Sequence, residues 1–196
     1  MSRWSSQEYN GQSTSVNAAT GAVTVLITAP YSATFGATRA EGRSTMMIEA
    51  TPSAVHLAAS ELPFADIGGG NKLKVIQVIE KEGLWIIENI FMKGFEVQTH
   101  RHTGPVWGYT VSGGWKYKEY DYVNRAGSFL YEPAGSVHTL QCIEDNTQVW
   151  FHMYGVNLNL AEDGSIESVA DGAGALAAYY ALCEAQGFDR PNVIVA

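Results

Sequence analysis

Three histidines lie at spacings that favour a metal site. His100 and His102 are separated by one residue, and His138 follows in a second, glycine-rich segment. Because alternate side chains of a β-strand share a face, His100 and His102 are expected to point the same way. A neighbouring strand that carries His138 would complete a site of three imidazole nitrogens. Zinc, iron, copper and nickel all accept such ligands, so the spacing predicts a metal centre without choosing the metal.

Glycines and a proline frame these histidines in two blocks. They read Gly94-x5-His100-x-His102-x4-Trp107-x6-Gly114 and Gly127-x5-Pro133-x-Gly135-x2-His138-x3-Cys142. The two blocks resemble the paired motifs of the cupin superfamily, whose usual motifs carry a glutamate and an asparagine where this chain has Trp107 and Cys142. The resemblance implies a metal-binding β-barrel in which the common carboxylate ligand is missing.

A narrower resemblance extends along the chain from Met47. The segments HRHTGPV-x-GYT, WKYKEYDYV and AGSFLYEPAGSVHTL, with a closing helix, resemble the 2,4'-dihydroxyacetophenone dioxygenase family. The acetylacetone-cleaving dioxygenases, which have three metal-binding histidines, are more distant relatives. The resemblance implies a non-haem Fe(II) dioxygenase, with Zn(II) as the alternative metal. Such an enzyme would use O2 to cleave the C–C bond adjacent to a carbonyl in an α-hydroxyketone or a β-diketone.

The residue pattern after Ile48 predicts β-strands separated by glycine-rich turns. Short strands about ten residues apart are typical of a jelly-roll barrel. The expected strands are 72–80, 84–91, 106–112, 114–122, 148–154 and 156–160, with a hairpin turn at 162–164. An Ala- and Leu-rich stretch at 174–186 predicts a helix that Gly187 ends. The fold class is therefore all-β, a small cupin (jelly-roll) barrel with a C-terminal α-helix and an N-terminal arm.

The chain is predicted to consist of a barrel over 47–170, a helix and tail over 171–196, and an extension over 1–46. The extension is rich in Ser, Thr, Ala and Gly and has one short apolar run, 23–27. It is either an ordered arm that pairs with another subunit or a disordered extension, unless Met46 or Met47 is the natural start. The family resemblance implies a homodimer.

Composition excludes several classes of partner. A formal net charge of −8 without a basic run argues against nucleic acid and anionic membrane surfaces. The sequence has no apolar stretch long enough to span a bilayer and no secretory signal pattern. Cys142 and Cys183 are expected to be free thiols in a reducing compartment, so the expected location is the cytoplasm. The expected partners are a small ketone and O2.

Strand alternation predicts which side chains surround the metal. Gln98 would share the inner face with His100 and His102. On the next strand, Trp107 and every second residue after it would point inward. On the third strand, Leu140 and Cys142 would share the face of His138. The late-strand His152 is either a structural histidine or a pocket residue. The predicted cavity is apolar and aromatic and suits a ketone better than a sugar, although these residues could also be barrel core. The candidate substrate-binding residues are Gln98, Trp107, Tyr109, Leu140, Cys142 and His152.

Two carboxylates are candidate catalytic residues. Glu132 directly precedes the turn that leads to His138, and in the acetylacetone-cleaving relatives a glutamate at comparable spacing lies in the polar shell around the ligands. Glu119 lies in the segment that most resembles the dihydroxyacetophenone family, or it pairs with a nearby lysine on a solvated face. Either carboxylate could hydrogen-bond a ligand imidazole or act as a base on the substrate.

Two other functions fit the same motifs. One is a metal-dependent isomerase or lyase that works without oxygen, which a test for oxygen consumption would separate from a dioxygenase. The other is a non-catalytic, zinc-binding sensor cupin of the kind found in ChrR-like anti-sigma factors. Those proteins carry an additional metal-binding segment, and residues 1–46 of this chain contain no His and no Cys.

Overall fold

The chain divides into two compact units, residues 1–51 and 52–196. The computed structural model describes residues 6–9, 12–16, 23–27 and 53–196. In the first unit, β1 (Ser6–Tyr9), β2 (Gln12–Val16) and β3 (Val23–Ile27) form an antiparallel sheet. Most of the 1–46 extension lies outside the described residues, as does Met47, so the nature of the extension stays a prediction.

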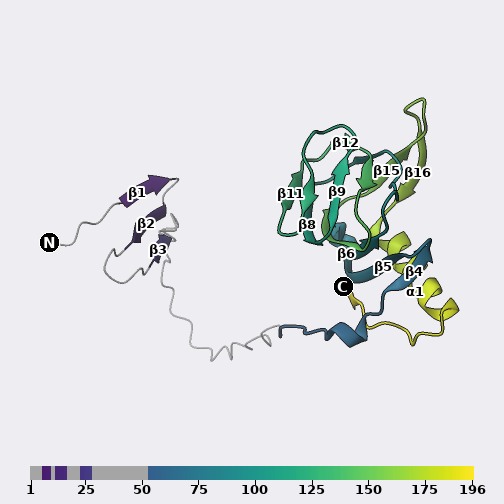
Figure 1. Ribbon diagram of the computed structural model, residues 1–196. Coiled ribbons are helices and arrows are strands. Elements are labelled where there is room, and N and C mark those ends of the chain that lie inside the picture. The colour runs from purple at the N-terminus through teal and green to yellow at the C-terminus, as the bar shows by residue number, and fades with distance from the viewer. Residues whose placement is uncertain (1–5, 10–11, 17–22, 28–52) are drawn as a thin grey trace, which may run out of the picture. The chain divides into compact units, whose positions relative to one another are not determined.

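The second unit is built around one large sheet (Figure 1). Its strands lie in the order β11-β8-β14-β6-β5-β17, with β4 paired to β5. Only the contact between β17 and β5 is parallel within this sheet of described strands. The strands are β4 (Ala65–Gly68), β5 (Asn71–Ile79), β6 (Leu84–Phe91), β8 (Val106–Ser112), β11 (Phe129–Glu132), β14 (Thr147–Tyr154) and β17 (Ile194–Val195).

Two smaller sheets complete the barrel. One has the order β12-β7-β15-β16 and the other the order β10-β9-β13. Two short 3-10 helices, η1 (Ala59–Glu61) and η2 (Glu80–Glu82), precede β4 and β6. The strands of the two sheets are β7 (His100–His102), β9 (Gly114–Tyr117), β10 (Asn124–Arg125), β12 (Val137–His138), β13 (Leu140–Cys142), β15 (Asn157–Leu160) and β16 (Ile166–Ala170).

A single α-helix in the described part of the chain, α1 (Gly172–Ala185), lies between β16 and β17 in the sequence and packs beside β4 and β5 (Figure 1). Its N-terminus is capped by Asp171, whose carboxylate accepts a hydrogen bond of 2.7 Å from the Gly174 N–H. Its C-terminus is followed by Gly187 at φ 76°, a conformation that favours glycine. The predicted all-β barrel with a closing helix is confirmed, and the helix begins two residues earlier than predicted. Within the described residues, no helix is long and apolar enough to cross a membrane.

Gly104 allows the segment after His102 to lie directly against the end of β14. A Cβ atom at Gly104 would lie 2.3 Å from the backbone oxygen of Tyr154, so the two backbones would have to separate. We expect Gly104→Ala to reduce the free energy of unfolding by about 2–3 kcal/mol, as measured by urea denaturation. Gly127→Ala is the control, because Gly127 has φ +86° and nothing within 4 Å; its expected loss is about 1 kcal/mol. Equal losses in the two variants would contradict the close approach.

Candidate metal centre

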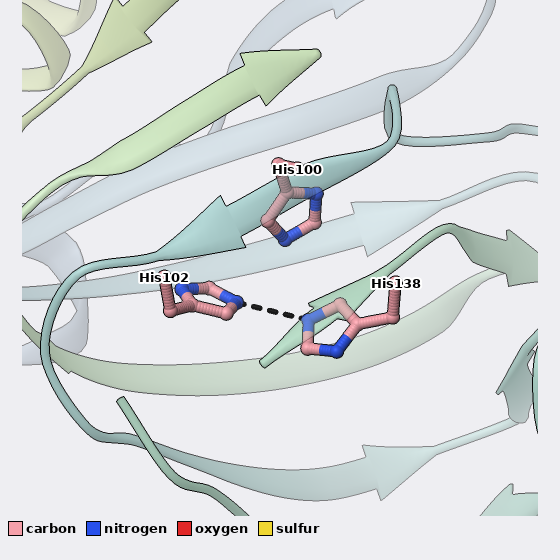
Figure 2. A group of neighbouring side chains, drawn as sticks. All are labelled: His100, His102 and His138. Carbon is pink, nitrogen blue, oxygen red and sulfur yellow. Dashed lines mark hydrogen bonds between the residues drawn. The ribbon is translucent and has the colours of Figure 1, made fainter. Parts of the chain in front are cut away.

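The three predicted histidines converge inside the barrel. His100 and His102 point from β7, and His138 points from β12, where it is the register partner of His100 (Figure 2). All three side chains are buried, and one ligand nitrogen from each lies within 4.8 Å of the others. The Nε2 atoms of His102 and His138 are 2.9 Å apart. This buried cluster could bind a metal ion.

A carboxylate from a different strand joins the cluster. Glu132 at the end of β11 is 3% exposed, and its Oε2 atom lies 2.7 Å from Nε2 of His102 and 3.2 Å from Nε2 of His138. Two ligand atoms about 2.1 Å from one ion and at right angles to each other lie about 3 Å apart. The Oε2 atom is buried and has no hydrogen bond of good geometry. The three imidazoles are therefore the set that could bind a divalent cation, and the Glu132 carboxylate lies against two of them.

The pairing of β8 with β11 explains how the Glu132 carboxylate comes to lie beside the histidines. Glu132 is the register partner of Val106, and both side chains are buried. Since register partners share a face, the inward position of β8 that follows the histidines is Val106. Its neighbour Trp107 is turned away from the metal centre. A carboxylate from the adjacent strand thus lies beside two of the histidines, whereas the first sequence block itself has none.

The predicted inward orientation of Trp107 and Tyr109 is wrong. Tyr109 is 48% exposed, while the alternating neighbours of these two residues on β8 face the interior. The ring of Trp107 lies against Tyr131 and His152 on the outer face of the large sheet, with centroid distances of 5.6 Å to each. His152 therefore also lies outside the cavity. The turn between β7 and β8 changes the parity of the alternation, which the spacing of residues alone does not reveal.

Gln98 also lies outside the cavity, contrary to the prediction. Its Nε2 donates a 3.0 Å hydrogen bond to the backbone oxygen of Leu160 at the surface. Val97 lines the cavity instead, because β7 begins only at His100 and the segment before it does not follow strand alternation. On the strand after His138, Leu140 lines the cavity, whereas the buried thiol of Cys142 donates to the backbone oxygen of Glu144 at 3.0 Å.

Glu119 is exposed and does not contact a ligand imidazole. Its carboxylate accepts a 3.0 Å hydrogen bond from the backbone N–H of Thr139, the residue after His138. The contact ties the segment after β9 to the strand that carries the third histidine. The prediction that Glu119 hydrogen-bonds a ligand ring is therefore wrong.

Tyr117 is a site residue that the sequence motifs did not single out. It is 2% exposed, and its hydroxyl donates a hydrogen bond to Oε1 of Glu132. Its ring stacks on the His138 imidazole with a centroid distance of 3.8 Å and an interplanar angle of 19°. Tyr117 thus holds two members of the cluster at once. The available signal was its alternation with Trp115 on a strand of aromatic residues, which places both on the inner face.

Hydrogen bonding and burial set the protonation of the cluster. The Nδ1 atom of His100 lies 2.7 Å from the backbone oxygen of Gln98, an arrangement that places the proton on Nδ1 and leaves Nε2 free for a metal. Burial lowers the pKa of His100 from 6.5 to about 4. Burial would raise the pKa of Glu132, but its contacts with His102 and His138 outweigh that effect and lower it to about 2. Near neutral pH, His100 is therefore neutral and Glu132 is ionised, as metal binding requires.

His100, His102 and Glu132 form one wall of a cavity of about 390 Å³ between the sheets. Side chains from all three barrel sheets and from α1 contribute to it, and most of them are apolar. Outside the metal cluster and Tyr117, the polar lining residues are Asn89 and Asn157. The remaining lining residues are Ile67, Leu73, Trp85, Ile87, Phe91, Phe95, Val97, Val106, Leu140, Phe151, Met153, Ala170 and Ala175. The candidate metal site therefore faces an apolar cavity.

Comparison with known families agrees with this geometry. The family model described as the ChrR cupin-like domain matches residues 52–157, more than half of the chain. This protein is a member of the ChrR cupin-like domain family. The match includes β7, β8, β11 and β12, and so every histidine of the cluster as well as Glu132. No curated protein matches the chain significantly.

Solved structures share the cupin fold. An RmlC-like cupin from Ralstonia eutropha is 27% identical, with a TM-score of 0.66 over 72% of this chain and 94% of that chain. A cupin-like protein of unknown function from the same organism is 28% identical, with a TM-score of 0.67 over 76% and 96%. An acetylacetone dioxygenase from Acinetobacter johnsonii is 17% identical, with a TM-score of 0.58 over 68% and 95%. The last similarity concerns the fold alone.

The depressed pKa of His100 predicts that the metal-free cupin loses stability in mild acid. Unfolded His100 takes up a proton near pH 6.5, whereas the folded state resists protonation down to about pH 4. Stability contributed by this residue is therefore complete above pH 6.5 and declines by about 3 kcal/mol as the pH falls to 4. Urea denaturation of metal-free protein across this range should show the decline. In His100→Gln the free energy of unfolding should fall less steeply with falling pH. An unchanged dependence on pH would contradict the assignment of this decline to His100.

Proposed function

We propose that this cupin is a non-haem Fe(II) dioxygenase that cleaves the C–C bond adjacent to a carbonyl in an α-hydroxyketone or a β-diketone. The observation that carries the proposal is the buried cluster of His100, His102 and His138 at the wall of an apolar cavity. Three neutral ligands leave most of the charge on a divalent ion, and such an ion favours a chelating, enolate-forming substrate. The similarity of fold to an acetylacetone dioxygenase supports the same class of reaction.

The residues of the cluster have separate roles in this proposal. The three imidazoles would hold the ion, which when bound supplies chelation of the substrate oxygens and activation of O2, and the ionised Glu132 carboxylate would lie beside His102 and His138. The carbonyl of Gln98 fixes the ring of His100, and Tyr117 fixes both Glu132 and His138. Apolar side chains keep water away from the reacting carbon. A role for Glu132 as a base on the substrate stays a prediction.

A zinc-binding sensor function is the second candidate, because the family that matches is described by the ChrR cupin-like domain. In that case the same three imidazoles would hold zinc, and no reaction would follow. A metal-dependent isomerase or lyase would also use the cluster but would consume no oxygen.

Metal analysis with an oxygen electrode tests the proposal. Protein purified without added metal is analysed for iron and zinc, then loaded with Fe(II) under argon and mixed with aryl hydroxyketones and β-diketones in aerated buffer. We expect about one iron per chain and oxygen uptake that depends on substrate, with label from ¹⁸O2 in the products. Tightly held zinc with no uptake after iron loading would overturn the dioxygenase and favour the sensor. Turnover without oxygen uptake would favour the isomerase or lyase.

A further inference from the structure

The strand register defines a row of side chains that runs along the cavity. His102 on β7 is the register partner of Asn157 on β15, and Asn157 is the register partner of Ala170 on β16. Neighbouring strands lie about 5 Å apart, and register partners share a face. All three side chains line the cavity. A straight row of side chains therefore leads from the metal cluster past Asn157 to Ala170, about 10 Å away.

The far end of this row is lined by small and apolar side chains. Ala170 is followed directly by the start of α1, which contributes Ala175, and the β4 strand contributes Ile67. The start of α1 is held close to the barrel, since a Cβ atom at Gly172 would lie 3.0 Å from side-chain atoms of both Trp85 and Val78. The helix cannot come nearer, and its residue Ala175 lines the cavity.

The lining excludes a charged substrate group away from the metal. Of the described residues around the cavity, Glu132 alone carries a carboxylate and none is a lysine or an arginine. A carboxylate or phosphate on the substrate would lose its water there without gaining a partner of opposite charge. The volume of about 390 Å³ equals that of roughly a dozen liquid water molecules. It accommodates a compound of about the same number of non-hydrogen atoms.

Asn157 is the polar group that a substrate meets along the row. Asn89 also lines the cavity, but its Nδ2 donates a 3.3 Å hydrogen bond to the backbone oxygen of Lys72. Asn159, on the same strand and two residues on, donates to Oγ of Ser168 at 2.9 Å and does not line the cavity. The amide of Asn157 lies one strand spacing from His102, within reach of an oxygen atom close to the chelated end of a ligand.

We propose that Asn157 selects the substrate by hydrogen-bonding one of its oxygen atoms. The ligand is an uncharged carbonyl compound whose oxygen-bearing end lies at His102 and whose apolar end lies against Ala170, Ala175 and Ile67. The part of this inference that places the oxygen-bearing end of the ligand at the metal rests on the proposed function. The mode of binding itself follows from the cavity and is tested without turnover.

Binding of simple probes to the metal-free, full-length protein under argon tests the inference. Acetophenone, toluene, benzoate and hexanophenone are titrated by calorimetry. We expect acetophenone to bind and benzoate not to bind. In Asn157→Leu the affinity for acetophenone should fall about 5- to 10-fold, while that for toluene, which has no oxygen, should not fall. Asn159→Leu is the matched control and should change neither. If Asn157→Leu does not fold, Asn157→Ala replaces it with the same expectation.

The apolar end is tested with a second variant. Ala175→Leu fills the far end of the cavity, so it should weaken hexanophenone at least about 10-fold more than acetophenone. If none of the probes binds, if benzoate binds as well as acetophenone, or if Asn157→Leu weakens toluene equally, the inference is overturned. Probe binding as expected without oxygen uptake after iron loading would overturn the dioxygenase alone. Oxygen uptake that Asn157→Leu leaves unchanged, with unchanged probe binding, would overturn only the role of Asn157.

Discussion

His102→Ala is expected to abolish metal binding and, with it, substrate-dependent oxygen uptake. His102 lies at the centre of the cluster, since its Nε2 is 2.9 Å from Nε2 of His138 and 2.7 Å from Oε2 of Glu132. Groups that only support a ligand change metal affinity by about 10- to 100-fold, and loss of a ligand should exceed that range. The affinity is measured by competition with a chelator, and the metal content by elemental analysis after gel filtration.

Two other histidines serve as controls for this result. His152 lies on the outer face of the large sheet beside Trp107, and His56 is exposed near the start of the second unit. Alanine at either position should leave one metal ion per chain. A variant His102→Ala that still binds metal with the affinity of the natural protein would rule out the cluster as the metal site.

Glu132→Gln is expected to produce the second-largest loss. The change keeps the shape of the side chain but removes the negative charge that faces His102 and His138. The pKa of Glu132 is lowered to about 2, so the carboxylate that this substitution removes is fully ionised near neutral pH. We expect metal affinity to fall about 10- to 100-fold and kcat, at saturating metal, to fall about 100-fold or more if the carboxylate also accepts a proton.

Comparison with nearby variants separates charge from packing. Tyr117→Phe removes the hydrogen bond to Glu132 but keeps the ring stacked on His138, so it should weaken metal binding by less than Glu132→Gln. Glu119→Gln is the control for loss of a carboxylate, because Glu119 is exposed and accepts its hydrogen bond from the backbone N–H of Thr139, not from a side chain of the metal cluster. A Glu132→Gln variant with unchanged affinity and unchanged kcat would show that the carboxylate has no part in the site.

The sequence by itself determined the features that depend on local spacing. The facing of His100 and His102 follows from alternation along one strand, and the burial of both is as predicted. The helix and its C-terminal end follow from an Ala- and Leu-rich stretch that stops before Gly187, whereas its capped start at Asp171 was seen only in the structure. The glycine and proline turn before His138 predicted that this third histidine lies on a strand beside the first two, because a turn of that kind returns the chain to a neighbouring strand.

Only the tertiary structure decided which residues surround those histidines. The turn from β7 to β8 changes which alternate residues face inward, so Val106 rather than Trp107 lies on the inner face. Glu132 and Tyr117 reach the cluster through the pairing of strands that are distant in sequence, and Asn157 faces His102 for the same reason. Alternation fixes the relative faces within one strand, but the register between strands is set by packing of the whole barrel.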